Sequence, residues 1–125
     1  MKYAVILLAT ALFAPFALAG SNTQTGTQSG NAWSEATVVT VQAGTGFSLT
    51  SATADFDIFF FDANGNEVGA SIACGPDAGT VPGNAATAEV RKWDDIGGVA
   101  PATACQEPLL GLPGVPGDFS YTDGL

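Results

Sequence analysis

Histidine is absent from this 125-residue chain, and cations are scarce. Without histidine there is no common general base to activate a serine or cysteine nucleophile, and no G-x-S-x-G sequence is present, so nucleophilic catalysis is disfavoured. Three Lys and Arg residues stand against twelve Asp and Glu residues, which gives a formal net charge of −9. Phosphate recognition needs clustered cations, so the composition argues against nucleic acid and anionic lipid as partners.

Cysteine occurs only twice, at Cys74 and Cys105. In an oxidising compartment two cysteines predict one disulfide. This disulfide would close a loop of about 30 residues and stabilise the fold by roughly 3–4 kcal/mol. A metal pair or a redox pair is the alternative, but the chain lacks histidine ligands and a C-x-x-C spacing. Lys92 lies beside Arg91 in a segment rich in acids, and we interpret it as part of a solvated face.

The first nineteen residues have the pattern of a secretory signal peptide. Lys2 begins the segment, an almost wholly apolar run follows, and Ala17-Leu18-Ala19 provides small residues for cleavage. The run is short for a transmembrane helix, which needs about 20 residues, although an uncleaved anchor remains the alternative. We therefore predict a protein that is secreted or held at the cell surface, with no membrane segment after cleavage.

Removal of residues 1–19 leaves two cations and all twelve acids, a side-chain charge of −10. The next segment, 20–32, consists mainly of Gly, Ser, Thr, Gln and Asn, and its composition predicts a flexible linker or arm. Residues 33–125 then form the one predicted domain, since the chain is short enough for a single core.

The domain has the residue pattern of an all-β protein. Alternating or β-branched runs predict strands at 36–41, 47–50 and 86–93, and a closing strand at 118–122. Residues 55–72 predict a β-hairpin around Asn64-Gly65, because these residues tolerate the positive φ of a tight turn. Prolines in 94–117 indicate a long irregular loop. The predicted fold is a small antiparallel β-sandwich, jelly-roll-like, with this loop pinned by the disulfide.

Four stretches in order, "ATVVTV", "GTGFSLTS", "ADFDIFFFDANGNEVG" and "GTVPGNAATAEVRKW", carry a resemblance to a known family. The chain resembles the bacterial pre-peptidase C-terminal domain over about residues 36–93. The resemblance implies a non-catalytic module that binds polysaccharide, a cell surface or matrix, and some relatives bind calcium. The proline-rich stretch after Trp93 departs from the family, where a regular strand follows.

The acidic residues of the predicted hairpin are candidate calcium ligands. Calcium takes six to eight oxygens, and Asp55, Asp57 and Asp62 offer several. The segment is not an EF-hand, because Glu67 and Ala73 occupy the places that need Gly and Glu. A simple acidic hairpin is the alternative. A catalytic pair of Asp55 and Asp57, about 7 Å apart on one strand face, is a weaker hypothesis, since glycosidases also need a long cleft.

Three aromatic residues are candidates for a sugar-binding platform: Trp33, Trp93 and Tyr121. Aromatic faces stack on apolar ligand faces when they are partly exposed. The alternative is that they pack in the core or at its edge, because a domain of this size needs large apolar groups to bury enough area.

These observations predict a secreted, non-enzymatic binding or cell-surface module whose partner is a polysaccharide or another cell-surface partner. The alternative is a self-assembling structural subunit of a filament or envelope, in which the N-terminal arm passes from one copy to another. A small secreted hydrolase is the third and weakest hypothesis.

Overall fold

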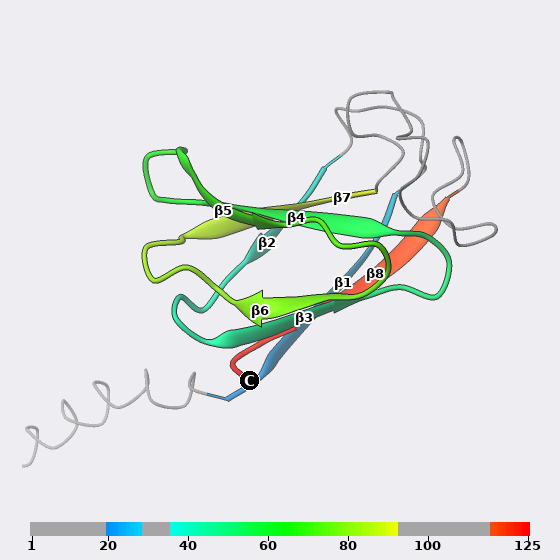
Figure 1. Ribbon diagram of the computed structural model, residues 1–125, viewed down its shortest axis with the longest axis horizontal. Coiled ribbons are helices and arrows are strands. Elements are labelled where there is room, and N and C mark those ends of the chain that lie inside the picture. The colour runs from blue at the N-terminus through cyan, green and yellow to red at the C-terminus, as the bar shows by residue number, and fades with distance from the viewer. Residues whose placement is uncertain (1–19, 29–35, 93–115) are drawn as a thin grey trace, which may run out of the picture.

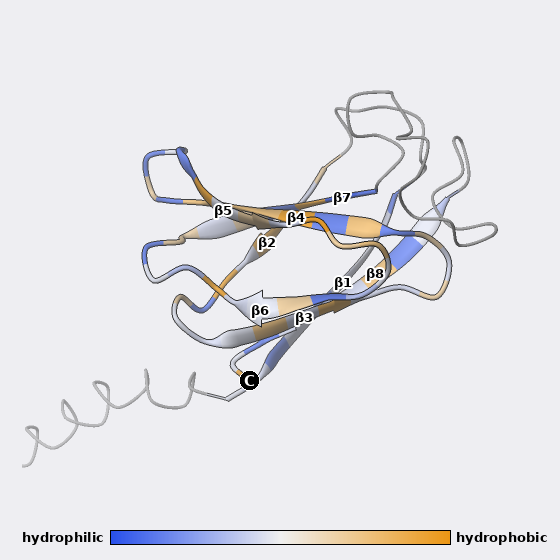
Figure 2. Cartoon of the chain, in the orientation of Figure 1, coloured by the Kyte–Doolittle hydropathy of each residue, from blue (hydrophilic) through white to orange (hydrophobic). Residues whose placement is uncertain are grey.

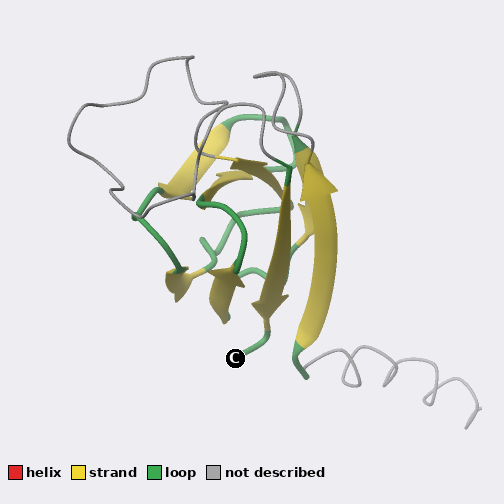
Figure 3. Ribbon diagram, turned by 90° about the vertical axis from the view of Figure 1, so that its right-hand side faces the viewer, coloured by secondary structure: helices red, strands yellow, loops and turns green. Residues whose placement is uncertain are grey.

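A computed structural model of the protein describes residues 20–28, 36–92 and 116–125 (Figure 1). The eight strands, in chain order, are β1 (Asn22–Gln28), β2 (Thr37–Thr40), β3 (Gly46–Thr50), β4 (Phe56–Phe61), β5 (Glu67–Ser71), β6 (Asp77–Thr80), β7 (Thr87–Lys92) and β8 (Gly117–Asp123). The described residues form no helix, and thus none that would cross a membrane (Figure 3). The predicted signal peptide, 1–19, lies outside the described residues.

The strands form two antiparallel sheets of four strands each. The first sheet, sheet A, has the order β1-β8-β3-β6, and the second, sheet B, has the order β2-β7-β4-β5. All six strand pairs are antiparallel. The prediction of an antiparallel all-β protein is therefore confirmed for the described residues.

One apolar core joins the two sheets, and Figure 2 shows apolar residues as orange bands along the strands. Period-two alternation supplies it, because successive side chains of a strand point to opposite faces. Phe47 of β3 meets Phe60 of β4 with ring centroids 5.2 Å apart, and Phe56 of β4 meets Phe119 of β8 at 5.3 Å. These two aromatic contacts hold sheet A against sheet B.

The hairpin of β4 and β5 forms where the sequence predicts it. Asp62 accepts hydrogen bonds from the backbone N–H groups of Asn64 and Asn66, both at 2.9 Å, and Gly65 has a φ of 86°. Such an Asx turn fixes the hairpin, and a glycine accepts the left-handed conformation without strain. β4 lies between β7 and β5, so it is a central strand of sheet B.

The prediction of a flexible linker over 20–32 is wrong for residues 22–28, which form a strand. Residues 22–28 form β1, an edge strand of sheet A that pairs along its whole length with β8. A second strand that was not predicted from the sequence, β6, lies inside the Gly- and Pro-rich stretch 74–85. Both segments are strands because their backbones pair with a neighbouring strand, although their sequences show no alternation of apolar and polar residues.

Only one of the two cysteines of the predicted disulfide, Cys74, lies in the described residues. Cys74 lies exposed in the turn between β5 and β6, and no cysteine in the described part of the chain is a free thiol. Cys105 lies outside the described residues, as does most of the predicted irregular loop. The pairing of Cys74 with Cys105 therefore stays a prediction.

Candidate functional site

The outer face of sheet B carries two phenylalanines that do not belong to the core. In β4, Phe56, Ile58 and Phe60 face the core, and alternation turns Phe59 and Phe61 to the opposite face. Both remain partly exposed. Such partly exposed rings in a central strand present apolar surface to solvent, where a ligand can cover it.

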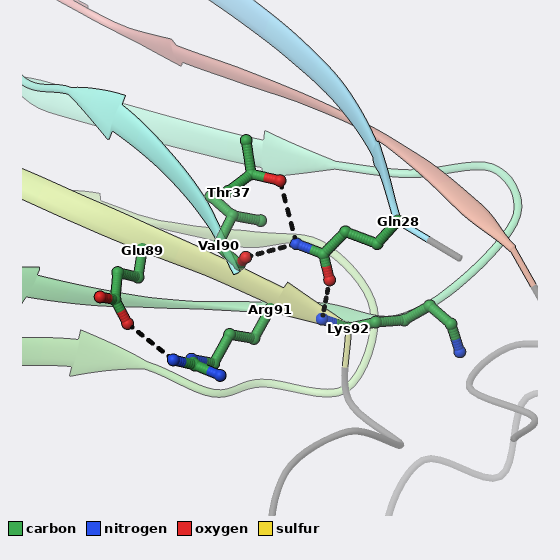
Figure 4. Close-up of polar contacts among 6 residues, drawn as sticks. All are labelled: Gln28, Thr37, Glu89, Val90, Arg91 and Lys92. Carbon is green, nitrogen blue, oxygen red and sulfur yellow. Dashed lines mark hydrogen bonds and ion pairs between the residues drawn. The ribbon is translucent and has the colours of Figure 1, made fainter. Parts of the chain in front are cut away.

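Charged side chains from the two neighbouring strands surround these rings. The register places Glu89 of β7 opposite Phe59, and Glu67 of β5 opposite Phe61. Arg91, two residues along β7, donates from Nη2 to Glu89 Oε1 at 3.0 Å (Figure 4). Together Phe59, Phe61, Glu67, Glu89 and Arg91 line an open hollow of about 230 Å³, which we call the sheet B hollow.

The sheet B hollow combines the two features that ligand sites use. The phenylalanine rings supply apolar faces for stacking, and the carboxylates and guanidinium supply hydrogen-bond groups that orient a ligand. Two carboxyl groups and one guanidinium group line the hollow, which gives it a formal charge of −1. Phe59 and Phe61 were not among the candidate contacts predicted from the sequence, although the alternation of β4 puts them on the face opposite the core.

Asp55 and Asp57 are buried, although they were predicted as calcium ligands. Each is about 1% exposed, and so is Asp77 of β6. The backbone of the turn between β5 and β6 binds two of these three aspartates. Gly75 N–H donates to Asp55 Oδ1 at 2.7 Å, and Ala73 N–H donates to Asp77 Oδ1 at 2.8 Å. Asp57 Oδ1 and Asp77 Oδ2 have no hydrogen-bond partner. Uncompensated carboxylate oxygens of this kind destabilise a fold unless they are neutralised.

Burial raises the pKa of Asp57 to about 8, and the negative charges of Asp55 and Asp77 add to the effect. Burial also raises the pKa of Asp77, against the hydrogen bonds from Ala73 and Ser71. Desolvation disfavours the charged carboxylate, and nearby acids act in the same direction. Asp57 is therefore protonated in the folded protein at neutral pH.

The third predicted calcium ligand does not join this cluster. Asp62 lies beyond the other end of β4, five residues from Asp57 and thus about 17 Å along an extended strand. Hydrogen bonds from the turn, first from the backbone of Asn66, lower the pKa of Asp62. Over residues 20–28, 36–92 and 116–125, no three His, Cys, Asp or Glu side chains are grouped to hold a metal ion. Calcium binding by this protein stays a prediction.

Of the three predicted aromatic contacts, only Tyr121 lies in the described structure. Its side chain is fully buried, and its hydroxyl donates to Asp123 Oδ2 at 2.8 Å. Burial, the hydrogen bond and the charge of Asp123 all raise the Tyr121 pKa. Alternation along β8 puts Tyr121 on the core face with Phe119, so its predicted role in a surface platform is wrong. Trp33 and Trp93 lie outside the described residues.

Lys92 also differs from its sequence interpretation. It was predicted on a solvated face, but it is fully buried. The register pairs it with Phe56, so it shares the core-facing side of sheet B. Because β7 has polar residues on both of its faces, its sequence did not indicate that Lys92 points to the core.

A scan against protein-family models finds no matching family, and a search of curated proteins finds no significant match. Among solved structures, the chain is similar to PliG of Aeromonas hydrophila, described as a periplasmic lysozyme inhibitor of g-type lysozyme. The identity is 12%, the TM-score is 0.44, and the match covers 83% of this chain and 84% of that chain. We draw nothing about fold or function from a likeness at that TM-score.

Proposed function

We propose that this protein is an exported, non-catalytic binding module that holds a neutral polysaccharide in the sheet B hollow. The observation that carries the proposal is the pair of partly exposed rings, Phe59 and Phe61, flanked by Glu67, Glu89 and Arg91. A sugar ring has an apolar face for stacking and hydroxyl groups for the charged side chains. The signal-peptide pattern of residues 1–19 supports an extracellular or cell-surface location.

The strand orders support a jelly-roll sandwich as the scaffold. Successive strands alternate between sheet A and sheet B, except for the β4–β5 hairpin, and each sheet has four strands. Eight strands in two facing sheets are typical of jelly rolls. This architecture also fits the resemblance to the pre-peptidase C-terminal domain.

The acids of the sheet B hollow favour binding over hydrolysis. Glycoside hydrolysis needs one carboxyl group that gives a proton to the leaving group. Glu89 Oε1 already accepts a hydrogen bond from Arg91 Nη2 at 3.0 Å, so this oxygen is engaged within the sheet rather than directed at a leaving group. A small hydrolase therefore remains the weakest of the three functions.

The test is binding to a panel of soluble and insoluble neutral polysaccharides by the secreted protein and two variants. We expect Phe61→Ala to weaken binding about fivefold or more, because stacked aromatic groups contribute about 1 kcal/mol or more when covered. Ile72→Ala is the matched control, since Ile72 is exposed and apolar but does not line the hollow. Equal losses in both variants would contradict the site, and no binding to any polysaccharide would contradict the ligand.

A second function, a self-assembling structural subunit, is favoured by β1. The N-terminal segment that would pass between copies is already a strand at the edge of sheet A. Edge strands can exchange between chains, because the same backbone groups pair in either arrangement. Light scattering over a concentration series tests this function, and a monomer at every concentration would exclude it.

A further inference from the structure

Strand β1 contacts the rest of the protein almost entirely through polar groups. Its sequence, NTQTGTQ, contains no apolar residue larger than glycine. Gln24, Gly26 and Gln28 are the residues that face inward, while their neighbours in the strand are exposed. Withdrawal of β1 would thus expose little apolar surface of the strand itself, and the hydrophobic cost of its departure would come from the residues that it covers, such as Phe119.

Gln28 makes the most specific of these contacts (Figure 4). Its side chain is fully buried. Nε2 donates to Val90 O at 2.6 Å and to Thr37 Oγ1 at 3.2 Å, while Oε1 accepts from Lys92 N–H at 3.0 Å. A buried amide needs such hydrogen-bond partners, so the surroundings of position 28 favour a glutamine there.

Gln24 repeats the arrangement four residues earlier. Its Nε2 donates to Thr40 O at 2.7 Å, and its Oε1 accepts from Thr40 N–H at 3.1 Å. Both glutamines therefore bind backbone groups of sheet B, although β1 belongs to sheet A. Gln24 also fixes the register of β1, since a shift of one residue would turn every side chain of the strand to the other face.

Gly26 fits between the two glutamines because the Phe119 ring leaves no room for a side chain. A Cβ at position 26 would lie 2.6 Å from Phe119 Cε1. The site that receives β1, which we call the β1 seat, therefore selects the pattern Gln-x-Gly-x-Gln. Residues 24–28 of the chain match that pattern, and every other copy of the protein carries it too.

We propose that β1 exchanges between copies, so that Asn22–Gln28 of one chain occupies the β1 seat of another. The occupant is a second copy because the seat selects a polar pattern that the protein itself supplies. An empty seat would uncover the Phe119 ring beside Gly26 and would remove the hydrogen bonds that Gln28 makes to Val90 O and Lys92 N–H, which favours refilling by an incoming strand. This inference rests on the second proposed function, self-assembly, and names the segment and the site that perform it.

The test uses a disulfide that forms only when β1 crosses to another chain. Thr23 and Thr122 are register partners, with their hydroxyl oxygens 2.9 Å apart. Full-length Thr23→Cys and Thr122→Cys chains, one with a size tag, are mixed at high concentration and mildly oxidised. We expect a tagged–untagged heterodimer on a non-reducing gel, and we expect excess peptide of residues 20–28, but not a scrambled peptide, to suppress it.

Two controls make the result decisive. Ala63→Cys, in the exposed β4–β5 turn, replaces Thr122→Cys to measure random collision, and a heterodimer yield no greater than this background overturns the inference. Thr23→Cys/Thr122→Cys in one chain must give an internal crosslink, which shows that the pair has bonding geometry. If light scattering shows assembly without the specific heterodimer, self-assembly stands and exchange of β1 fails. If it shows only monomers and no heterodimer forms, both fail.

Discussion

Strands β1 and β4 are similar in length but are held in opposite ways. β4 is central, and its core-facing residues, Phe56, Ile58 and Phe60, are almost fully buried among other apolar groups. β1 is an edge strand fixed by the amide groups of Gln24 and Gln28 and by the close approach of Phe119 to Gly26. Apolar burial makes β4 part of the core, whereas β1 is held by backbone pairing and amide hydrogen bonds, which is the basis of our proposal that it exchanges between copies.

The largest expected loss of stability comes from truncation of a core side chain of β4. Phe60→Ala removes a buried ring that packs edge-on against Phe47, and we expect a loss of about 3–5 kcal/mol in the free energy of unfolding. Urea unfolding followed by circular dichroism measures it. A loss below about 1 kcal/mol would contradict the assignment of Phe60 to the shared core.

Asp57 makes β4 sensitive to pH. Its pKa is raised in the folded protein to about 8 from 3.8, so the folded state binds a proton that the unfolded state releases. The stability from this proton is full below about pH 4 and is lost as pH rises toward 8, by up to about 1.4 kcal/mol per pH unit.

Asp57→Asn separates this effect from other titrations. The amide cannot ionise, so we expect the variant to match the native protein near pH 4 and to exceed its stability at pH 8, by up to about 5 kcal/mol. Thermal melting of both proteins at each pH measures the difference. Parallel curves across this range would contradict the raised pKa.

Removal of the anchor of β1 should have a smaller effect than removal of the Phe60 ring. Gln28→Ala leaves Val90 O and Lys92 N–H without their partner, and we expect a loss of about 1–3 kcal/mol. Because the loss falls on β1, hydrogen exchange in β1 and in its partner β8 should accelerate before exchange in β4 does. Equal acceleration in all three strands would show that β1 is no more detachable than the core.

Thr25→Val gives the smallest expected change. Thr25 points outward from β1 and is exposed, and both residue types favour strands, so unfolding should shift by no more than about 0.5 kcal/mol. The same denaturant titration measures it. A loss as large as that of Gln28→Ala would mean that outward side chains, and not the inward amides, hold β1.

The difference between the two strands also explains which parts of the fold were predictable. Alternation and Asn64-Gly65 predict β4, its turn and β5, because an apolar face and a tight turn leave clear signals. β1 has no such face, since its inward residues are glutamine and glycine. Tyr121 was assigned to the surface although its alternation with Phe119 indicated the core.

The candidate site was only partly predictable for a related reason. Alternation puts Phe59 and Phe61 on the outer face of β4, but the hollow also needs Glu67 from β5 and Glu89 from β7. Their positions follow from strand pairing between segments far apart in the chain, and the pattern of one strand does not specify that pairing. Burial of Asp55 and Asp57 likewise depends on neighbouring elements, including the turn before β6.

The most direct test of the proposed function is a titration of the ¹⁵N-labelled protein with the polysaccharide fragments that bind in the panel, followed by amide chemical shifts. The account predicts that saturable shifts concentrate at Phe59, Phe61, Glu67, Glu89 and Arg91, with the amides of β1 and β8 unchanged. Shifts centred on any other surface, or no saturable shift with any neutral fragment, would contradict the sheet B hollow as the binding site.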